Sequence, residues 1–261
     1  MKPLPLLTIG AAVGTLLIRQ HRESRRSERL AAAALESLLN AVDANDAETG
    51  AHVRRVAAYS VALARAANLD DSTIHSIERV ALFHDIGKIH EALFDIVHGG
   101  DGEVTPEERR LIATHPRRGA DVLQPLAFFY PDLPEGVLSH HERWDGTGYP
   151  RRLAGKEIPI AARVVAIADT FDAVTHRRRY RRAHRLDDGA RAIADGRGSH
   201  FDPRLAALFL EPDVLTTVRR IARKSWRPRT MSREPERPRR EAPRVPDVTF
   251  RWREGPHAPF P

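Results

Sequence analysis

The chain of 261 residues contains no cysteine. This absence excludes a disulfide framework, a thiolate metal site and a cysteine nucleophile. Any metal ion must therefore be held by histidine and carboxylate side chains, a donor set that suits Mn, Fe, Mg or Zn. Aromatic residues are also few, at 6%, whereas alanine, leucine and arginine are abundant, which favours helices.

Lysine is rare as well. Only Lys2, Lys88, Lys156 and Lys224 occur among the 42 basic residues, and all the others are arginine. Because the composition is so strongly biased towards arginine, a lysine that is kept inside a motif indicates a specific chemical role.

The net charge of +7 belongs to the two ends of the chain. Residues 1–30 hold six basic and two acidic residues, and residues 222–261 hold eleven and five. The 191 residues between them hold 25 basic and 28 acidic residues. The basic balance therefore does not indicate a nucleic-acid-binding fold, and no nucleic-acid partner is expected.

Residues 3–18 form the longest uncharged run, of 16 residues. A membrane-spanning helix usually needs about 17–25 residues, so the run is slightly short. Lys2 precedes it and five arginines follow it by residue 29. This asymmetry predicts an uncleaved anchor in the inner membrane, with the catalytic domain on the cytoplasmic side. The alternative is a loose tail or an upstream mis-start, which the two prolines and two glycines of the run favour.

Helical periodicity extends from Ser27 to about Leu210, and no stretch shows sustained strand alternation. Beyond Ile221 the chain is rich in proline and arginine without a period, which predicts disorder. We therefore expect an all-α fold with three parts: an apolar segment and basic linker at 1–30, a folded domain at 31–221 and a disordered tail at 222–261.

Several expected helices carry a histidine on their apolar face. His52 shares its face with Val56, Tyr59 and Leu63. A second helix, starting at a Ser72 cap, has an apolar stripe that ends in His84.

A third helix also fits this pattern. Thr105 is expected to cap it, with Pro106 in the first turn and Glu108 completing a capping box. Its stripe ends in His115, and Pro116 is expected to terminate it.

These histidines, together with neighbouring acidic and histidine residues, indicate a metal site. Asp85 follows His84, His140 precedes His141, and Asp169 interrupts a strongly apolar helix. A buried carboxylate without a cation is very costly. A carboxylate can bridge two divalent ions while imidazoles fill the outer positions, and such a pair activates a hydroxide for in-line attack on a phosphate ester. A buried histidine with an ordinary structural role is the alternative at each single position.

At this point the chain resembles the HD-GYP family, a branch of the HD phosphohydrolase superfamily, over roughly residues 35–212. The resemblance rests on several motifs in the same order: "TGAHVRRV" (49–56), "LFHDIGKI" (82–89), "THPRRGADVL" (114–123), "HHERWDGTGYP" (140–150), "IPIAARVVAIADTFDAVT" (158–175) and "FDP" (201–203). It implies a bundle of about seven helices and hydrolysis of cyclic di-GMP to the linear dinucleotide or to GMP.

The resemblance also assigns roles to single residues. It implies two or three divalent ions, Fe or Mn, held by His52, His84, Asp85, His115, His140, His141 and Asp169, with Glu48 as a ligand of a third ion. Asp85 would bridge two ions, and Lys88 would contact phosphate and assist the leaving group. Lys88, Arg178, Arg181 and Tyr149 would bind the substrate. For Glu48, a solvated acid at a helix start is the alternative, and for the two arginines it is a solvated basic run.

The chain departs from the family pattern in three segments. Residues 90–104 lack the usual Pro-Asp, Arg179 replaces the usual Pro of the basic motif, and Arg151 and Arg152 replace the usual Asp-Gly after Tyr-Pro. The added arginines predict a more cationic entrance to the site. In the family, the Gly-Tyr-Pro loop is also implicated in contacts with GGDEF-type synthases. Two alternatives to the phosphodiesterase stay open: a nucleotide-binding adaptor with weak turnover, and an HD enzyme acting on another nucleotide.

Overall fold

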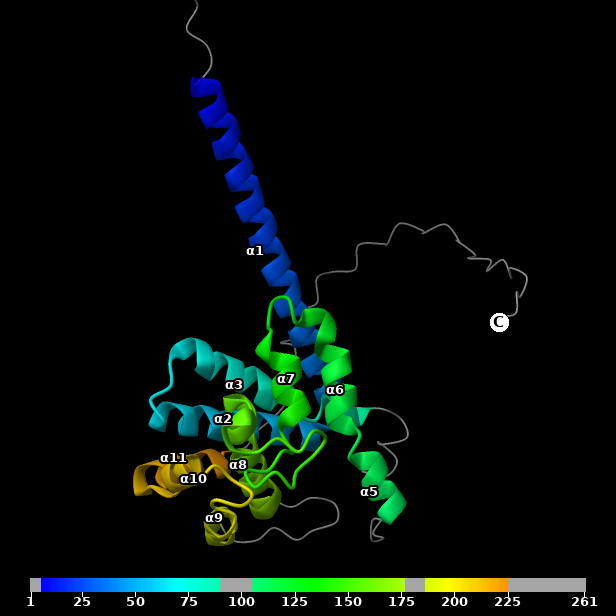
Figure 1. Ribbon diagram of the computed structural model, residues 1–261, viewed down its shortest axis with the longest axis vertical. Helices are drawn as coiled ribbons and strands as arrows, with labels where there is room; N and C mark the ends of the chain where they lie inside the picture. Colours follow the sequence, from blue (N-terminus) through cyan, green and yellow to red (C-terminus); the bar gives the residue numbers. More distant parts are fainter. Residues whose placement is uncertain (1–5, 90–104, 177–185, 225–261) are drawn as a thin grey trace, which may run out of the picture. The chain divides into compact units, whose positions relative to one another are not determined.

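The computed structural model describes residues 6–89, 105–176 and 186–224, with side chains from residue 19 onward apart from residues 45 and 47. In these ranges Figure 1 shows helices and no strand arrows, and the only strand-like features are two isolated bridges. The α-helices are α1 (Leu6–Asn45), α2 (Ala47–Ala66), α3 (Asp71–Phe83), α5 (Pro106–Ile112), α6 (His115–Leu123), α7 (Asp132–Ser139), α8 (Ile160–Thr175), α9 (Leu186–Asp195), α10 (Pro203–Leu210) and α11 (Pro212–Ala222). Short 3-10 helices are η1 (Ile86–Ile89), η2 (Gln124–Leu126) and η3 (Gly155–Glu157). The predicted all-α class is confirmed.

Local capping chemistry explains where several helices begin. Asp46 caps α2 by accepting from the backbone N–H groups of residues 48 and 49. Asp70 caps α3, so the predicted cap at Ser72 is wrong; the Ser72 hydroxyl instead donates to Asp70. A carboxylate placed just before the helix accepts from the third backbone N–H, which a residue already inside the first turn cannot do. The capping box between Thr105 and Glu108 is confirmed.

Helix α1 runs without a break through residue 30, where we expected a domain boundary. The side chains of residues 19–30 are exposed, whereas Ala31, Leu35 and Val42 are buried, and α1 contacts α2. Within the described part of the chain, no helix is both long and apolar enough to cross a membrane. The anchor predicted for residues 3–18 is not supported by this finding, and the described part of its uncharged run lies in the same helix as the arginine-rich residues 19–29.

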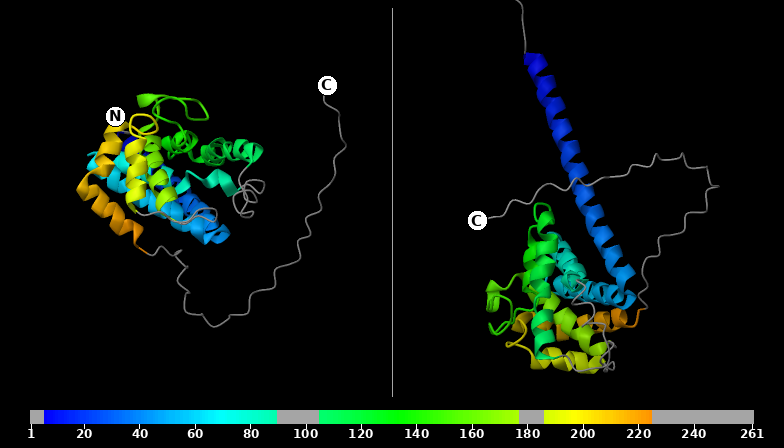
Figure 2. Two further views of the ribbon diagram at one scale, coloured as in Figure 1. Left: turned by 90° about the horizontal axis from the view of Figure 1, so that it is seen from below. Right: turned by 90° about the vertical axis from the view of Figure 1, so that its right-hand side faces the viewer.

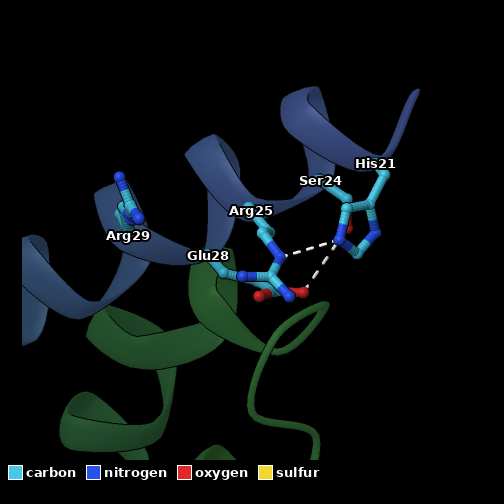
Figure 3. A pocket seen from close by; sticks show the side chains of 5 residues that line it. All are labelled: His21, Ser24, Arg25, Glu28 and Arg29. Carbon is cyan, nitrogen blue, oxygen red and sulfur yellow. Dashed lines mark hydrogen bonds between the residues drawn. The ribbon is translucent and has the colours of Figure 1, made fainter. Parts of the chain in front are cut away.

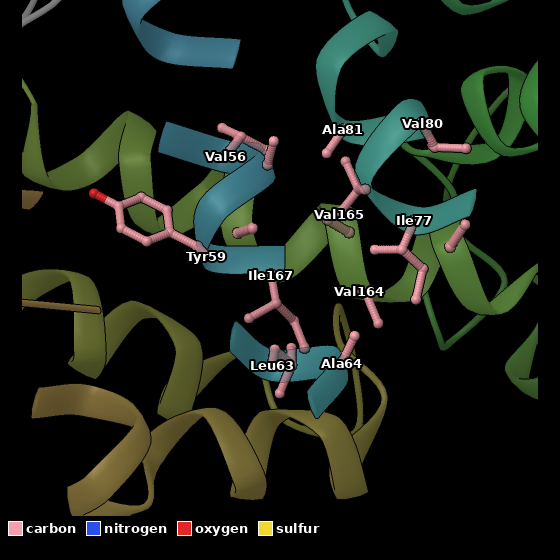
Figure 4. Close-up of a cluster of buried hydrophobic side chains, with 14 of the residues drawn as sticks. Val56, Tyr59, Leu63, Ala64, Ile77, Val80, Ala81, Val164, Val165 and Ile167 are labelled. Atoms are coloured by element: carbon pink, nitrogen blue, oxygen red, sulfur yellow. The ribbon is translucent and has the colours of Figure 1, made fainter. Parts of the chain in front are cut away.

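The core lies between α2, α3 and α8. Side chains from the three helices, including Val56 and Leu63 of α2, Ile77 of α3 and Val164 and Ile167 of α8, meet in one buried cluster (Figure 4). These positions recur at helical spacing, so each helix turns one apolar face to the others. His52 and His84 lie at buried positions of the same faces, as their periodicity predicted.

Close backbone approach brings η1 against α6. A Cβ atom on Gly87 would lie 2.1 Å from the carbonyl oxygen of His115 and 2.6 Å from the nitrogen of Gly119. Only glycine permits this distance. Because Gly87 follows Asp85 by two residues, the contact sets Asp85 beside the start of α6. On the other side of the core, α9, α10 and α11 contact one another in succession and α11 packs on α2 (Figure 2).

His115 lies at the start of a helix rather than at the end of one, as we had expected. We placed it at the end of the helix that starts at Thr105, with Pro116 as the terminator. That helix, α5, ends at Ile112, and His115 is the first residue of α6, where Pro116 occupies the first turn. Proline lacks the N–H that the first turn leaves unpaired, so it starts a helix as readily as it ends one.

Candidate metal centre

Two groups of three side chains could each hold a metal ion. Within each group, the ligand atoms lie within 4.8 Å of one another. The first cluster contains His52 of α2, His84 at the C-terminal cap of α3 and Asp169 of α8. The second cluster contains His115 of α6 with His140 and His141 at the end of α7. Six of the predicted ligands are thus brought together by five helices.

Asp85 lies between the two clusters. Its Oδ2 atom is 3.6 Å from His84 Nε2 and 3.9 Å from His52 Nε2 in the first cluster. Its Oδ1 atom is 3.3 Å from His115 Nε2 in the second cluster. One carboxylate therefore presents one oxygen to each group, which is the arrangement required of a bridge between two ions.

Backbone hydrogen bonds fix the tautomers of three histidines. The Nδ1 atoms of His84, His115 and His140 lie 2.8, 2.7 and 2.6 Å from the carbonyl oxygens three residues earlier. A carbonyl oxygen only accepts, so Nδ1 must carry the proton in each ring. Each neutral ring then directs the lone pair of Nε2 into the centre, as a metal ligand requires.

Two further observations fit a bound cation. His84 Nε2 is buried without a hydrogen-bond partner among the described residues, a costly state for a polar atom. His115 Nε2 and His140 Nε2 lie 3.1 Å apart, and with both protons on Nδ1 their lone pairs face each other. A divalent ion would relieve both conditions, and the nitrogen and oxygen donors are those that Fe, Mn and Zn accept.

The first cluster has a carboxylate behind it that the sequence reasoning did not select. Asp172 of α8 is 1% exposed and its Oδ2 lies 2.7 Å from His52 Nδ1. Arg55 of α2 donates to both of its oxygens, at 2.7 and 2.8 Å. His176 Nδ1 lies 3.0 Å from Oδ1. A second acid on the apolar helix 160–175 was the available signal.

Burial and neighbouring charges set the protonation states of the centre. Burial lowers the pKa of His84 and His140, and burial with the nearby His115 lowers that of His141 to about 3. Burial alone would raise the pKa of Asp85, but Lys88, His84 and His115 hold it well below its usual range. The result is neutral imidazoles around an ionised carboxylate, the forms that bind metal ions.

Lys88 and Tyr149 border the centre. Lys88 Nζ lies 2.7 Å from each oxygen of Asp85. The ring of Tyr149 stacks on His141 with centroids 4.9 Å apart. Burial and the charge of Asp85 raise the pKa of the Tyr149 hydroxyl, which stays protonated.

The loop from Glu142 to Leu153 is held by a buried acid. The Glu142 carboxylate accepts from the backbone N–H groups of Arg151 and Leu153, at 2.7 and 3.1 Å. Gly148 passes so close to residue 142 that a Cβ atom would lie 2.6 Å from its Cα. These contacts position Tyr149 against His141.

The two arginines after Tyr-Pro differ: Arg151 has side-chain partners, and Arg152 has a left-handed backbone conformation. The Arg151 guanidinium donates to Glu135 and, at 2.7 Å, to the hydroxyl of Ser139. Arg151 is therefore paired with a partly exposed carboxylate, and the more cationic entrance stays a prediction. Arg152 has a φ of 57°, the left-handed conformation that glycine adopts most easily.

Of the predicted site residues, Glu48 is described by the structure and is not brought to the centre. Glu48 is exposed in the first turn of α2 and belongs to neither cluster. Arg178 and Arg181 lie outside the described residues, as does the atypical segment 90–104.

A shallow polar hollow lies on α1, away from these ligands (Figure 3). It is lined by His21, Ser24, Arg25, Glu28 and Arg29, and Arg25 Nε donates to His21 Nε2 at 2.8 Å. All five side chains come from one helix and are exposed, so the hollow has no enclosed site and includes none of the predicted site residues.

The HD domain family matches residues 36–205, nearly two thirds of the chain. This chain belongs to the HD domain family. The matched range contains every residue of the two clusters and Asp85, so the recognition made from the motifs is confirmed.

Relatives in the family carry related names. The chain is 36% identical over 176 residues to the 3'3'-cGAMP-specific phosphodiesterase 2 of Vibrio cholerae, covering 67% of this chain and 33% of that protein. It is 34% identical over 192 residues to a cyclic di-GMP phosphodiesterase of Thermotoga maritima, covering 71% and 51%. The chain thus spans between a third and a half of the length of these relatives.

Among solved structures, the HDG"Y"P protein Bd1817 of Bdellovibrio bacteriovorus has a TM-score of 0.53 at 21% identity, covering 74% of this chain and 63% of that one. At this identity the likeness concerns the fold, and it places the chain in the HD-domain helical architecture.

Proposed function

We propose that this HD domain hydrolyses a phosphodiester bond of a cyclic dinucleotide, with cyclic di-GMP as the first substrate to test. The observation that carries the proposal is the pair of clusters joined by Asp85, one oxygen towards each. Relatives at 34–36% identity are named phosphodiesterases of cyclic di-GMP and 3'3'-cGAMP, which supports the substrate class.

Two divalent ions would be held by the first and second clusters with Asp85 between them, and such a pair supplies Lewis acidity and an activated water. Fe or Mn is the choice that the resemblance to the HD-GYP family implies, and the histidine and carboxylate donors are compatible with either. Glu48 would be a ligand of a third ion, which requires its side chain, exposed in this structure, to turn towards the centre.

The remaining residues act on the substrate. Lys88, next to Asp85, would bind the scissile phosphate and give its proton to the leaving oxygen. Arg178 and Arg181 would hold the second phosphate, since a guanidinium fork suits this contact. Tyr149, stacked on His141, would lie under a base or sugar at the rim.

The choice of substrate and the contact with a partner protein involve further residues and ligands. The relatives' names include two cyclic dinucleotides, so 3'3'-cGAMP is the alternative substrate. The exposed side chains of the Gly-Tyr-Pro loop, among them Asp145 and Thr147, would form the contact with a GGDEF-type synthase.

The test uses the full chain, purified anaerobically and loaded with Mn(II) or Fe(II). Cyclic di-GMP and 3'3'-cGAMP are incubated separately and products are resolved by chromatography. We expect linear dinucleotide or GMP from the preferred substrate, and no product from Asp85→Ala. Asp202→Asn is the matched control, because Asp202 is also a buried, arginine-paired carboxylate, 2.8 Å from Arg163, but lies outside both clusters. Bound metal without turnover of either dinucleotide would contradict the proposal and favour a receptor.

A further inference from the structure

Asp169 and Asp172 contact the two ring nitrogens of His52 from opposite sides. His52 Nε2 faces the centre, 3.3 Å from Asp169 Oδ1, while His52 Nδ1 lies 2.7 Å from Asp172 Oδ2. The two acids are one turn apart on α8. His52 and Arg55 are one turn apart on α2. Arg55 donates a hydrogen bond to each oxygen of Asp172.

This support differs from that of the other histidines. The Nδ1 atoms of His84, His115 and His140 face neutral backbone carbonyls. Only His52, among the cluster histidines with a described Nδ1 partner, faces an ionised carboxylate. A carboxylate behind an imidazole fixes the ring and raises its strength as a ligand more than a carbonyl does.

Asp172 forms a buried ion pair with Arg55. The Arg55 guanidinium donates to both carboxylate oxygens, and Nδ1 of His52 and Nδ1 of His176 lie 2.7 and 3.0 Å from them. Each oxygen of Asp172 has two close partners, so neither the position nor the charge of the group can change without breaking a contact.

We propose that Asp172, fixed by Arg55, is a positioning residue that orients His52 and selectively strengthens metal binding at the first cluster. The inference rests on the metal centre of the proposed function but requires no particular substrate. The substitution Asp172→Asn would keep the volume of the side chain and remove its charge. The new amide would face either Arg55 or His52 Nδ1 with the wrong polarity, and in the second case would favour the tautomer that blocks Nε2.

The experiment titrates the metal-free full chain with Mn(II) and counts bound ions by the signal of free Mn(II) in electron paramagnetic resonance. Wild type is expected to bind two ions. In Asp172→Asn we expect one affinity to fall by about 10–100-fold while the other changes less than about 3-fold. Asp202→Asn, which disturbs a comparable buried ion pair, should bind both ions as wild type does.

Assignment of the weakened position comes from His141→Ala, which removes a ligand of the second cluster. The double variant with Asp172→Asn should bind no ion tightly, whereas either single variant keeps one. If Asp172→Asn does not fold by circular dichroism, Arg55→Lys serves in its place, since it keeps the charge and loses the two-pronged contact, and the same selective loss is expected.

Unchanged affinity for both ions in a folded Asp172→Asn protein, or an equal loss at both positions, would overturn the positioning role. A wild-type chain that binds no divalent ion would overturn the metal centre itself. Normal metal binding without hydrolysis would overturn the proposed substrate and leave this inference intact.

Discussion

Lys88 is the basic residue in contact with Asp85. Its Nζ lies 2.7 Å from both oxygens of Asp85 and its side chain is 21% exposed. In the proposed reaction Lys88 would supply a proton, which a guanidinium does not readily release.

Substitution of Lys88 by arginine should therefore separate binding from catalysis. We expect the KM for the cyclic dinucleotide to change by less than about 3-fold, because the positive charge stays. We expect kcat to fall by about 100-fold or more, because general acid assistance is lost. Steady-state kinetics of the metal-loaded chain measure both. Lys156→Arg, at an exposed position in η3, is the control, and a fall in kcat of less than about 3-fold for Lys88→Arg would remove Lys88 from proton transfer.

At the scale of single helices, sequence rules located the start of α5 but misplaced the cap of α3 and the helix that carries His115. The capping box at Thr105 was readable because its residues are three apart. The end of α5 was not, because the break at residues 113–114 contains neither glycine nor proline. Pro116 then gave a terminator signal inside what is the first turn of α6.

The contact of η1 with α6 gives a prediction about stability. Gly87→Ala would place a Cβ atom 2.1 Å from the carbonyl oxygen of His115, so backbone must move and Asp85 moves with it. We expect the free energy of unfolding to fall by about 2–4 kcal/mol in urea titrations.

The control for this substitution is Gly198→Ala. Gly198 has a φ of 79° with no atom within 4 Å of an added Cβ, so only the left-handed backbone is penalised, by about 1–2 kcal/mol. Gly87→Ala also should weaken Mn(II) binding, and Gly198→Ala should not. Equal effects of the two substitutions on metal binding would show that the η1 contact does not set the position of Asp85.

At the scale of the whole molecule, the buried histidines make the metal-free protein sensitive to acid. Burial lowers the pKa of His84 and His140 and brings that of His141 to about 3, against about 6.5 in an unfolded chain. Below about pH 6.5 the unfolded chain therefore binds more protons than the folded one, and stability falls as pH falls.

We expect the free energy of unfolding of the metal-free protein to be constant above about pH 7.5 and to decrease from about pH 6.5 downward. The slope should approach about 1.4 kcal/mol per pH unit for each fully titrating histidine. Asp85 and Asp172, whose pKa values are lowered, add a loss of the same sign below about pH 3.8. Urea titrations at half-unit intervals measure the profile, and constant stability between about pH 7 and about pH 5 would contradict the neutral, buried state of these rings.

The core should be independent of the first part of α1. Side chains 19–30 are exposed, and buried positions begin at Ala31. Removal of residues 1–30 should therefore change the Tm by no more than about 2–4 °C, corresponding to less than about 1 kcal/mol for a domain of this size. Removal of residues 1–36, which also takes away Leu35, should lower it clearly further, and equal Tm values for the two truncations would contradict the packing of α1 on α2.

The all-α class, the apolar faces of the core helices and the residue types of the candidate site could be predicted from local features of the chain. These depend on helical period, on caps within three residues and on motif order, all of which are local in the chain. Three contacts became visible only in the tertiary structure. Asp85 lies between two clusters, and His52 Nδ1 faces Asp172, 120 residues away. Arg151 donates a hydrogen bond to Glu135. The physical reason is that these partners are brought together by the packing angles of helices and by close approach at Gly87, and no spacing along the chain encodes either.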